Sequence, residues 1–338
     1  LVPGGTFLFN TQWSVDELDE KLPGQVKRYI AENNINFYII DGVKIGKEIG
    51  LGNRINTVLQ SAFFSLTKLI PEEKVIKLMK DAATASYAKK GDDVVKMNHD
   101  AIDAGATAYI KVDVPESWKN CPDDDLTEKI GEGRPEVIDF VKNVQAKVNA
   151  QQGNTIPVSV VKTYETGNTP SGTAAYEKRG VATDVPVWDA DKCIGCNICS
   201  YVCPHACIRP VAMTEEEAAA APEGMQMKEM LGMPQYKFAI TVSAFDCTGC
   251  GSCANVWPGK KGAKALTMVN MEANYAESQK VYDFGQTLPI KQEVIDKFKP
   301  TTVKGSQFKQ PLLEFSGACA GCGETPYAKL ITQLFGDR

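Results

Sequence analysis

The sequence lacks long apolar runs and clustered basic residues. The first absence argues against a membrane-spanning protein, and the second argues against a nucleic-acid-binding protein. Its longest apolar windows, such as FYII at 37–40 and QSAFFSLTKLI at 60–70, are shorter than the roughly 18 residues that a membrane span needs. The start of the chain has neither the charged region nor the apolar centre of a signal peptide. A net charge of −5 and a pI near 5.4 leave no basic face for phosphates. We expect a cytoplasmic protein with no membrane and no nucleic-acid partner.

The sequence also lacks an initiator methionine. It begins at Leu1 and stops at LITQLFGDR, directly after an apolar segment with helical spacing. We therefore expect it to be part of a longer protein. Its 338 residues, 43% of them hydrophobic, can bury a sizeable core, and this length favours two or three folded units over one.

Cysteine, by contrast, is abundant. All but two of the eleven cysteines fall into three tight groups, and only Cys121 and Cys207 stand apart. Disulfides rarely distribute in this way, and the chain has no secretory signal. Repeated Cys-x2-Cys spacings in such a chain indicate metal ligands.

The first part of the chain alternates helical patterns with short apolar runs. A helical pattern that begins near Ser14 leads into the buried run NFYII at 36–40, and Asp41-Gly42 ends that run. Alternation of this kind is typical of an open α/β layer. Further helices are predicted at 53–69, 72–89 and 94–105, followed by a strand at 107–114.

The segment EIGLGNRINT at 48–57 has two interpretations. Glycines ahead of a helix can expose backbone N–H groups to a phosphate. The simpler interpretation is that Gly50 and Gly52 form the turn that starts the helix.

Less regular segments follow. A turn-rich connector leads to one helix near 135–149, and from 155 to 187 the chain reads as an extended strap rich in Gly, Thr and Pro. Residues 214–235 read as a solvated insertion with a local helix. Residues 276–310 read as a linker.

Two cysteine runs have the pattern of ferredoxins with two clusters. Three thiolates, each separated by two residues, can wrap three corners of a 4Fe-4S cubane and leave the fourth corner to a distant ligand. In the crossed arrangement of such ferredoxins, the fourth cysteine of one run ligates the other cluster. Zinc is the alternative, but structural zinc favours cysteine pairs separated by a longer loop. The candidate ligands are Cys193, Cys196, Cys199 and Cys203 in the first run and Cys247, Cys250 and Cys253 in the second.

Each run is expected to supply a loop, a short helix after the proline and an apolar strand. The strands are KFAITV before the second run and ALTMV after it. Two such halves should pack about a pseudo-dyad.

Trp257 stands where the second run should have its fourth cysteine. An indole N–H only donates hydrogen bonds, so it cannot ligate iron, and the cluster of the first run would lack one ligand. Three explanations stay open. The cluster sheds an iron or takes water at that corner, Cys207 moves in, or the molecule has a cysteine at position 257.

Cys319 and Cys322, in ACAGCGETP, form a less specific motif. A lone Cys-x2-Cys is found in zinc sites, redox sites and helix caps. Two thiolates cannot hold a cubane, so either two more ligands lie beyond Arg338 or the pair is not a cluster site. Cys121 is expected to be inert, and His99 and His205 are expected to have structural roles.

Four segments together resemble pyruvate:ferredoxin (flavodoxin) oxidoreductases, in order and over the whole chain. They are GNRINTVLQSAFF at 52–64, GTAAYEKRG and VPVWDADKC at 172–193, CIGCNICSYVCPHACIRP at 193–210, and SGACAGCGETPYAKL at 316–330.

The resemblance implies an open α/β layer plus an α+β ferredoxin-like domain with two 4Fe-4S clusters, and the start of a further α/β thiamine-binding domain. The implied boundaries are 1–118 for the rear half of the 2-oxoacid oxidoreductase gamma-type domain, 119–187 for the connector helix and strap, 188–275 for the two-cluster domain, 276–310 for a linker, and 311–338 for the start of the thiamine pyrophosphate domain.

The resemblance also implies chemistry. In that family pyruvate loses CO2 on thiamine pyrophosphate, coenzyme A takes the acetyl group, and electrons leave through 4Fe-4S clusters to ferredoxin or flavodoxin. By match, Cys319 and Cys322 would be two ligands of a third, proximal cluster, and Glu324 would lie close to thiamine pyrophosphate. A homodimer with bound magnesium is implied for the intact enzyme.

This sequence lacks the Gly-Asp-Gly motif that holds the diphosphate and magnesium in thiamine enzymes. The sequences GDD at Gly91 and GDR at Gly336 lack the third glycine. The chain alone is therefore expected to carry electrons but not to convert pyruvate. Two alternatives remain: a dedicated iron-sulfur carrier that uses its α/β unit to dock a partner, and an oxidoreductase for another 2-oxoacid.

Overall fold

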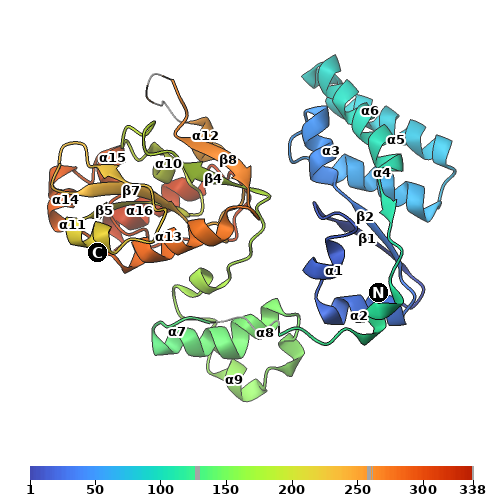
Figure 1. The fold of residues 1–338 in the computed structure, drawn as a ribbon, viewed down its shortest axis with the longest axis horizontal. Coiled ribbons are helices and arrows are strands. Elements are labelled where there is room, and N and C mark those ends of the chain that lie inside the picture. Colours follow the sequence, from blue (N-terminus) through green and yellow to red (C-terminus); the bar gives the residue numbers. More distant parts are fainter. Residues whose placement is uncertain (126–129, 257–259, 261, 337–338) are drawn as a thin grey trace. The chain divides into compact units, whose positions relative to one another are not determined.

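The computed structural model describes residues 1–125, 130–256, 260 and 262–336. The chain divides into two units, Leu1–Thr127 and Glu128–Arg338, and Figure 1 colours it along its length. Within the described ranges, every helix is too short or too polar to serve as a membrane span.

The first unit is built on a three-stranded sheet. β1 (Thr6–Asn10) and β2 (Asn36–Ile40) run parallel, and β3 (Ile110–Lys111) pairs with β2 in the antiparallel direction. The predicted α/β character and the strand at 36–40 are confirmed, whereas β1 was not predicted and β3 is shorter than the expected 107–114. The helices are α1 (Leu18–Lys21), α2 (Gly24–Glu32), α3 (Gly42–Ile49), α4 (Asn56–Thr67), α5 (Glu72–Tyr87) with the 3-10 turn η1 (Ala88–Lys90), α6 (Asp92–Thr107) and the 3-10 turn η2 (Glu116–Asn120).

The segment 48–57 forms the end of a helix. The carboxylate of Asp41 accepts a hydrogen bond from the Lys44 N–H at 2.8 Å and caps the start of α3. Gly50 then ends α3 with a left-handed φ of +97°. This geometry supports the interpretation that Gly50 and Gly52 form a turn.

The second unit is centred on two antiparallel strand pairs, each of which joins the two cysteine runs. A strand before the first run, β4, pairs with a strand after the second, β8, and β5 after the first run pairs with β7 before the second. This exchange is the pseudo-dyad that the repeat predicted. The strands are β4 (Asp184–Trp188), β5 (Ile208–Met213), β6 (Lys228–Glu229), β7 (Lys237–Val242) and β8 (Leu266–Asn270).

The short helix of each run lies within the run. α10 (Ile198–Tyr201) precedes Pro204, and α12 (Ser252–Asn255) occupies the equivalent place after Gly251. The prediction of a helix after the proline was therefore wrong for the first run, and in the second run Pro258 lies outside the described residues. Each helix starts beside the third cysteine, which fixes the direction of that side chain, and the two helices contact each other.

The insertion at 214–235 has its predicted local helix and is mostly exposed or half-buried, but it also contributes three buried methionines to the core. α11 (Glu215–Ala219) begins with a capping box between Thr214 and Glu217. After it, three methionines pack into the main hydrophobic cluster. The burial of these methionines was not predicted, because methionine spacing in an irregular segment gives no periodic signal. The buried methionines are Met225, Met230 and Met233.

The segments on either side of the cysteine runs are more ordered than predicted. The predicted helix at 135–149 is confirmed, but the strap is not simply extended, and its last residues form β4. The segment 276–310 begins with α13 (Tyr275–Thr287), which contacts β7 and β5 and is drawn in orange in Figure 1. The remaining elements are α7 (Pro135–Phe140), the π-turn η3 (Val141–Gln145), α8 (Ala146–Asn149), the 3-10 turn η4 (Gly153–Thr155), α9 (Val158–Lys162), the 3-10 turn η5 (Thr173–Tyr176), α14 (Gln292–Lys297), α15 (Val303–Ser306) and α16 (Thr325–Phe335).

Candidate metal centre

The first cysteine run folds as a tight loop around its own sulfurs. Gly195 (φ +65°) and Asn197 (φ +60°) both adopt left-handed conformations between the cysteines. The turn at Gly195 directs its backbone N–H to the Cys193 Sγ at 3.3 Å. An N–H···S bond of this kind stabilises a thiolate in a buried site.

The second run repeats this geometry. Gly249 (φ +66°) and Gly251 (φ +72°) stand at the equivalent positions, and the Gly249 N–H points to the Cys247 Sγ at 3.4 Å. A Cβ at Gly249 would come within 3.1 Å of the Asp184 carbonyl oxygen, so this position favours glycine for contact as well as for φ. The two runs therefore have the same backbone design.

The structure brings cysteines of both runs to one cavity. Cys203 from the first run lines it together with the three cysteines of the second, and the walls are completed by Pro186, Ile208 and Met268. The crossed arrangement that the spacing predicts requires this grouping of Cys203 with the second run. The cysteines of the second run in this cavity are Cys247, Cys250 and Cys253.

The chemistry of this donor set fits a 4Fe-4S cluster. All four thiols are free, and burial raises the pKa of Cys247 to about 12. Soft thiolates in an apolar cavity suit iron and sulfur, and cluster binding would release their protons. Among the described residues, no three His, Cys, Asp or Glu side chains are placed to hold a single metal ion. Cubane thiolates bind separate iron atoms and need not converge on one point.

The other three cysteines of the first run form a second group. Cys193 and Cys199 are buried and Cys196 is half-buried. Burial raises the pKa of Cys199, and the neighbouring Cys193 and Cys196 thiols add to this effect. Trp257, at the position expected to complete this group, lies outside the described residues.

Cys207 lies at the cavity that Cys203 shares with the second run. It is 1% exposed and lines that cavity beside Cys203. Its thiol donates to the Asp246 carbonyl oxygen at 3.0 Å, and its proximity to Cys203 lowers the pKa of the Cys203 thiol. This placement speaks against Cys207 as the missing ligand of the Cys193 group.

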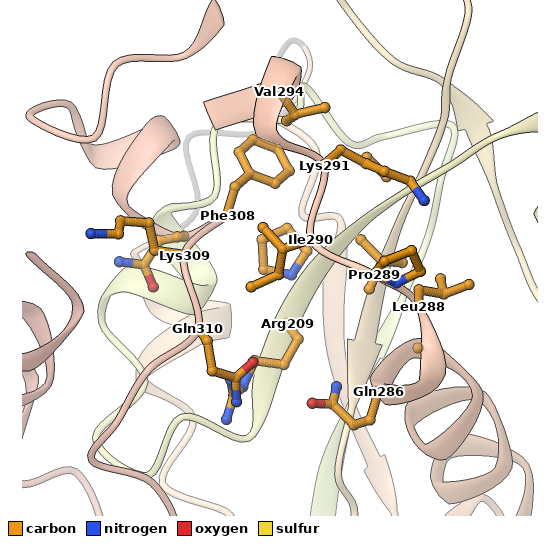
Figure 2. A pocket seen from close by; sticks show the side chains of 15 residues that line it. Arg209, Gln286, Leu288, Pro289, Ile290, Lys291, Val294, Phe308, Lys309 and Gln310 are labelled. Atoms are coloured by element: carbon orange, nitrogen blue, oxygen red, sulfur yellow. The ribbon is translucent and has the colours of Figure 1, made fainter. Parts of the chain in front are cut away.

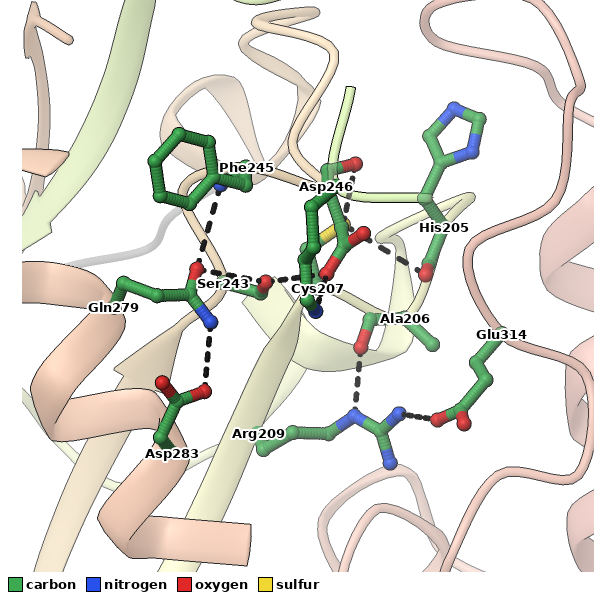
Figure 3. A network of polar contacts seen from close by, with 11 residues as sticks. His205, Ala206, Cys207, Arg209, Ser243, Phe245, Asp246, Gln279, Asp283 and Glu314 are labelled. Atoms are coloured by element: carbon green, nitrogen blue, oxygen red, sulfur yellow. Dashed lines mark hydrogen bonds and ion pairs between the residues drawn. The ribbon is translucent and has the colours of Figure 1, made fainter. Parts of the chain in front are cut away.

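Polar contacts join Cys207, which follows the first run, to Asp246, which directly precedes the second run, as Figure 3 shows. The buried Asp246 carboxylate accepts a hydrogen bond from Ser243 Oγ at 2.5 Å, and the same Ser243 Oγ lies 3.2 Å from Gln279 Oε1. Gln279 lies on α13. The predicted linker therefore supports the cysteine loop through these contacts.

The motif of Cys319 and Cys322 lies against the second run. Cys319 is exposed and Cys322 is half-buried. Gly321, between them, is so near the second run that a Cβ there would lie 3.5 Å from the Cys250 Cβ. Glu324 stands at the N-cap of α16 and is exposed. These two cysteines do not join the four-cysteine cavity.

The histidines have structural surroundings. His205 is buried, and its Nδ1 lies 2.9 Å from the Ser316 carbonyl oxygen. His99 Nε2 lies 3.0 Å from the Lys80 carbonyl oxygen on the neighbouring helix. Cys121 is free and half-buried in the first unit.

A separate pocket lies between β5 and the segment 285–310, and Figure 2 shows its side chains. No cysteine lines it. Two of its cations are already paired, Arg209 with Glu314 and Lys291 with Glu217. The pocket therefore offers little free charge for a ligand.

Sequence reasoning missed two lysines near the cysteines. Lys178, inside the quoted segment GTAAYEKRG, pairs with Asp246 directly before Cys247. Lys329, inside SGACAGCGETPYAKL, is fully buried against the first run. Both lie in segments that the resemblance had marked, but an ordinary lysine in a polar segment carries no signal of burial.

Three family models match the chain. Residues 1–108 match pyruvate ferredoxin/flavodoxin oxidoreductase, residues 123–182 match EKR, a domain of unknown function, and residues 192–260 match a 4Fe-4S dicluster domain. The last of these supports iron and sulfur as the ligand of the cysteine runs.

Similar proteins match along the whole chain. A pyruvate-flavodoxin oxidoreductase of Enterobacter agglomerans is 48% identical over 100% of this chain, and a pyruvate:ferredoxin oxidoreductase of Moorella thermoacetica is 48% identical over 99%. The chain spans 28% of the length of each. A pyruvate dehydrogenase [NADP(+)] of Cryptosporidium parvum is 43% identical over 99% of this chain, which covers 18% of that protein.

Proposed function

The chain belongs to the family of pyruvate-flavodoxin and pyruvate:ferredoxin oxidoreductases, and from this premise we propose that it is the electron-transferring part of an enzyme that oxidatively decarboxylates pyruvate to acetyl-CoA and CO2. The observation that carries the proposal is the cavity in which Cys203 of one run meets the cysteines of the other. Such a crossed pair of runs is the binding site of two 4Fe-4S clusters.

The ligand assignment follows this geometry. Cys203, Cys247, Cys250 and Cys253 hold one cluster, and Cys193, Cys196 and Cys199 hold three corners of the other. A bound 4Fe-4S cluster supplies reversible one-electron transfer. The protein positions the sulfurs, excludes water by burial and donates backbone N–H groups from Gly195 and Gly249.

Electrons enter from the side of Cys319 and Cys322. These residues supply two ligands of a third, proximal cluster in the proposal. The position of Gly321 supports this direction, because a Cβ at Gly321 would lie in van der Waals contact with Cys250. From the Cys250 group the route continues to the Cys193 group.

The remaining parts of the proposal concern the intact enzyme. Residues 1–118 are the rear half of the gamma-type catalytic domain, 188–275 the two-cluster domain, and 311–338 the start of the thiamine pyrophosphate domain, with Glu324 near that cofactor. Thiamine pyrophosphate, magnesium and coenzyme A bind to the intact enzyme, which is a homodimer. Clusters held by free cysteines favour the reducing cytoplasm.

The electron acceptor is ferredoxin or flavodoxin. The names of two relatives give one of each. The name of a third relative gives NADP(+) as the acceptor and pyruvate as the substrate. The acceptor is therefore more variable among these relatives than the substrate.

Cysteine variants test the crossed assignment. The protein is loaded with iron and sulfide without oxygen, and reduced clusters are followed by electron paramagnetic resonance (EPR). Cys203→Ser and Cys250→Ser should lose the same signal, although the residues come from different runs, and Cys199→Ser should lose the other. Cys207→Ala is the matched control from the same cavity and should keep both signals.

Three outcomes contradict the proposal. If Cys203→Ser and Cys199→Ser remove the same signal, each run holds its own cluster and the crossed assignment fails. If the 338-residue chain alone forms acetyl-CoA from pyruvate, then the catalytic step does not need the Gly-Asp-Gly motif that its sequence lacks. Zinc in place of iron would contradict electron transfer itself.

A further inference from the structure

One face of α16 packs against the first cysteine run, and the buried residues of that face are polar. Its buried residues are Thr325, Lys329 and Gln333, which recur every four residues and so lie on one side of the helix. The opposite side exposes large apolar residues, among them Tyr327 and Ile331. A helix that buries its polar side has specific partners for it.

Lys329 has three such partners. It is 1% exposed, and its Nζ donates to the carbonyl oxygens of Ser200 at 2.5 Å, Tyr201 at 3.1 Å and Cys203 at 3.1 Å. An ammonium group has three N–H donors and no acceptor, so three carbonyls satisfy it completely.

These carbonyls have a defined place in the fold. Ser200 and Tyr201 are the last two residues of α10, and the Ser200 carbonyl also accepts hydrogen bonds from the backbone N–H groups of Val202 and Cys203. A cation at a helix C-terminus is favourable. The three carbonyls also lie in the short segment between Cys199 and Cys203, which belong to different cluster sites in the proposed assignment.

Lys329 keeps its charge in this surrounding. Its Nζ has three carbonyl acceptors, which match the three N–H donors of an ammonium group, whereas a neutral amine has only two. The geometry therefore fits the charged form of the side chain. Arg209, a cation whose charge acts on Lys329, is itself paired with Glu314.

We propose that Lys329 is an electrostatic tuning residue: its buried ammonium raises the reduction potential of the cluster that Cys203 ligates, and to a smaller degree that of the cluster ligated by Cys199. This inference rests on the proposed function, because it requires the two clusters. It goes beyond that function because it gives α16, the helix that follows Cys322, a direct role in setting the reduction potentials of the clusters.

The sign of the effect follows from charge. Reduction adds a negative charge to the cluster, and a fixed cation nearby in a medium of low dielectric constant stabilises the added charge. Loss of the cation should therefore make the potential more negative. Undocking of α16 would act in the opposite direction, because water reaching the cluster also stabilises the added charge. The direction of the shift separates charge loss from a structural defect.

The experiment is an EPR-monitored redox titration of the iron-sulfur protein that contains this chain. Lys329→Met should shift the signal that Cys203→Ser abolishes to a more negative midpoint potential, with a smaller negative shift of the other signal. Lys329→Arg keeps the charge and should stay close to the wild-type midpoint. Lys297→Met, at an exposed position of α14, changes the net charge equally and should shift neither signal.

The midpoint potential of Lys329→Met tests the tuning role, and cluster binding by the wild-type protein tests the proposed function. An unchanged or more positive midpoint in Lys329→Met overturns the tuning role while leaving the clusters and the proposed function intact. A wild-type protein that binds no cluster overturns both proposals. If Lys329→Met binds too little iron for a titration, Lys329→Gln takes its place, because glutamine keeps hydrogen-bond donors without the charge. A midpoint potential of Lys329→Gln more negative than that of the wild type supports the proposal, and a wild-type midpoint overturns it.

Discussion

Lys178 forms an ion pair with Asp246, the residue directly before Cys247. The Asp246 side chain is 3% exposed and the Lys178 side chain 36%. The Lys178 ammonium also lies 4.8 Å from the ring centre of Phe315. Three segments that are distant in sequence therefore meet at one charge pair beside a candidate cluster ligand.

Lys178→Met should destabilise the protein, because it leaves the Asp246 carboxylate buried without its cation. We expect a loss of about 2 kcal/mol, below the value for a fully buried pair because Lys178 is partly exposed. Urea unfolding measures it. The matched control is Arg179→Met, which removes a neighbouring, more exposed pair with Glu177 and should cost less than about 0.5 kcal/mol. Equal losses in both variants would show that the Asp246 pair has no special weight.

Gly321 should not tolerate a side chain. Its φ of +73° is left-handed, a backbone conformation that residues with a Cβ adopt only with strain. Gly321→Ala should therefore lower the free energy of unfolding by about 1–2 kcal/mol. Gly317→Ala is the control in the same loop, because a Cβ at Gly317 meets nothing within 4 Å. Urea unfolding of both variants makes the comparison, and an unchanged Gly321→Ala protein would contradict the strain argument.

The cysteine sites were the part of the fold that the sequence predicted best. Cysteine spacing reflects ligand geometry directly, so the meeting of Cys203 with the second run followed from the pattern. The strands at 237–242 and 266–270 were also predicted, because they are short apolar runs beside the cysteines.

Segments whose burial depends on distant partners were not predictable. Met230 is buried in an irregular stretch that has no periodicity. Tyr282 is 3% exposed because α13 packs on β5 and β7, contacts that local sequence does not encode. α16 has a polar side and an apolar side, and the sequence alone would favour burying the apolar side. The burial of Lys329 depends on the carbonyls of α10, which only the folded chain brings to it.

The last prediction concerns position 257, which lies outside the described residues. Tryptophan cannot ligate iron, and Cys207 is placed beside Cys203 and Cys247. Two explanations then remain for the Cys193 group. Either the molecule has cysteine at 257, or the cluster lacks a protein ligand at one corner.

Peptide mass spectrometry over residues 254–261 separates them, and of the two we expect the mass of cysteine. If the mass is that of tryptophan, the oxidised protein should show the EPR signal of a three-iron cluster, because three thiolates leave one iron without a protein ligand. Trp257→Cys should then abolish that signal and add about one iron per cluster by this ligand count. The matched comparison is Cys207→Ala in the tryptophan form, which should leave the signal unchanged because Cys207 faces the other site. Two intact cubanes in the oxidised tryptophan form would show that the Cys193 group has a fourth ligand other than residue 257.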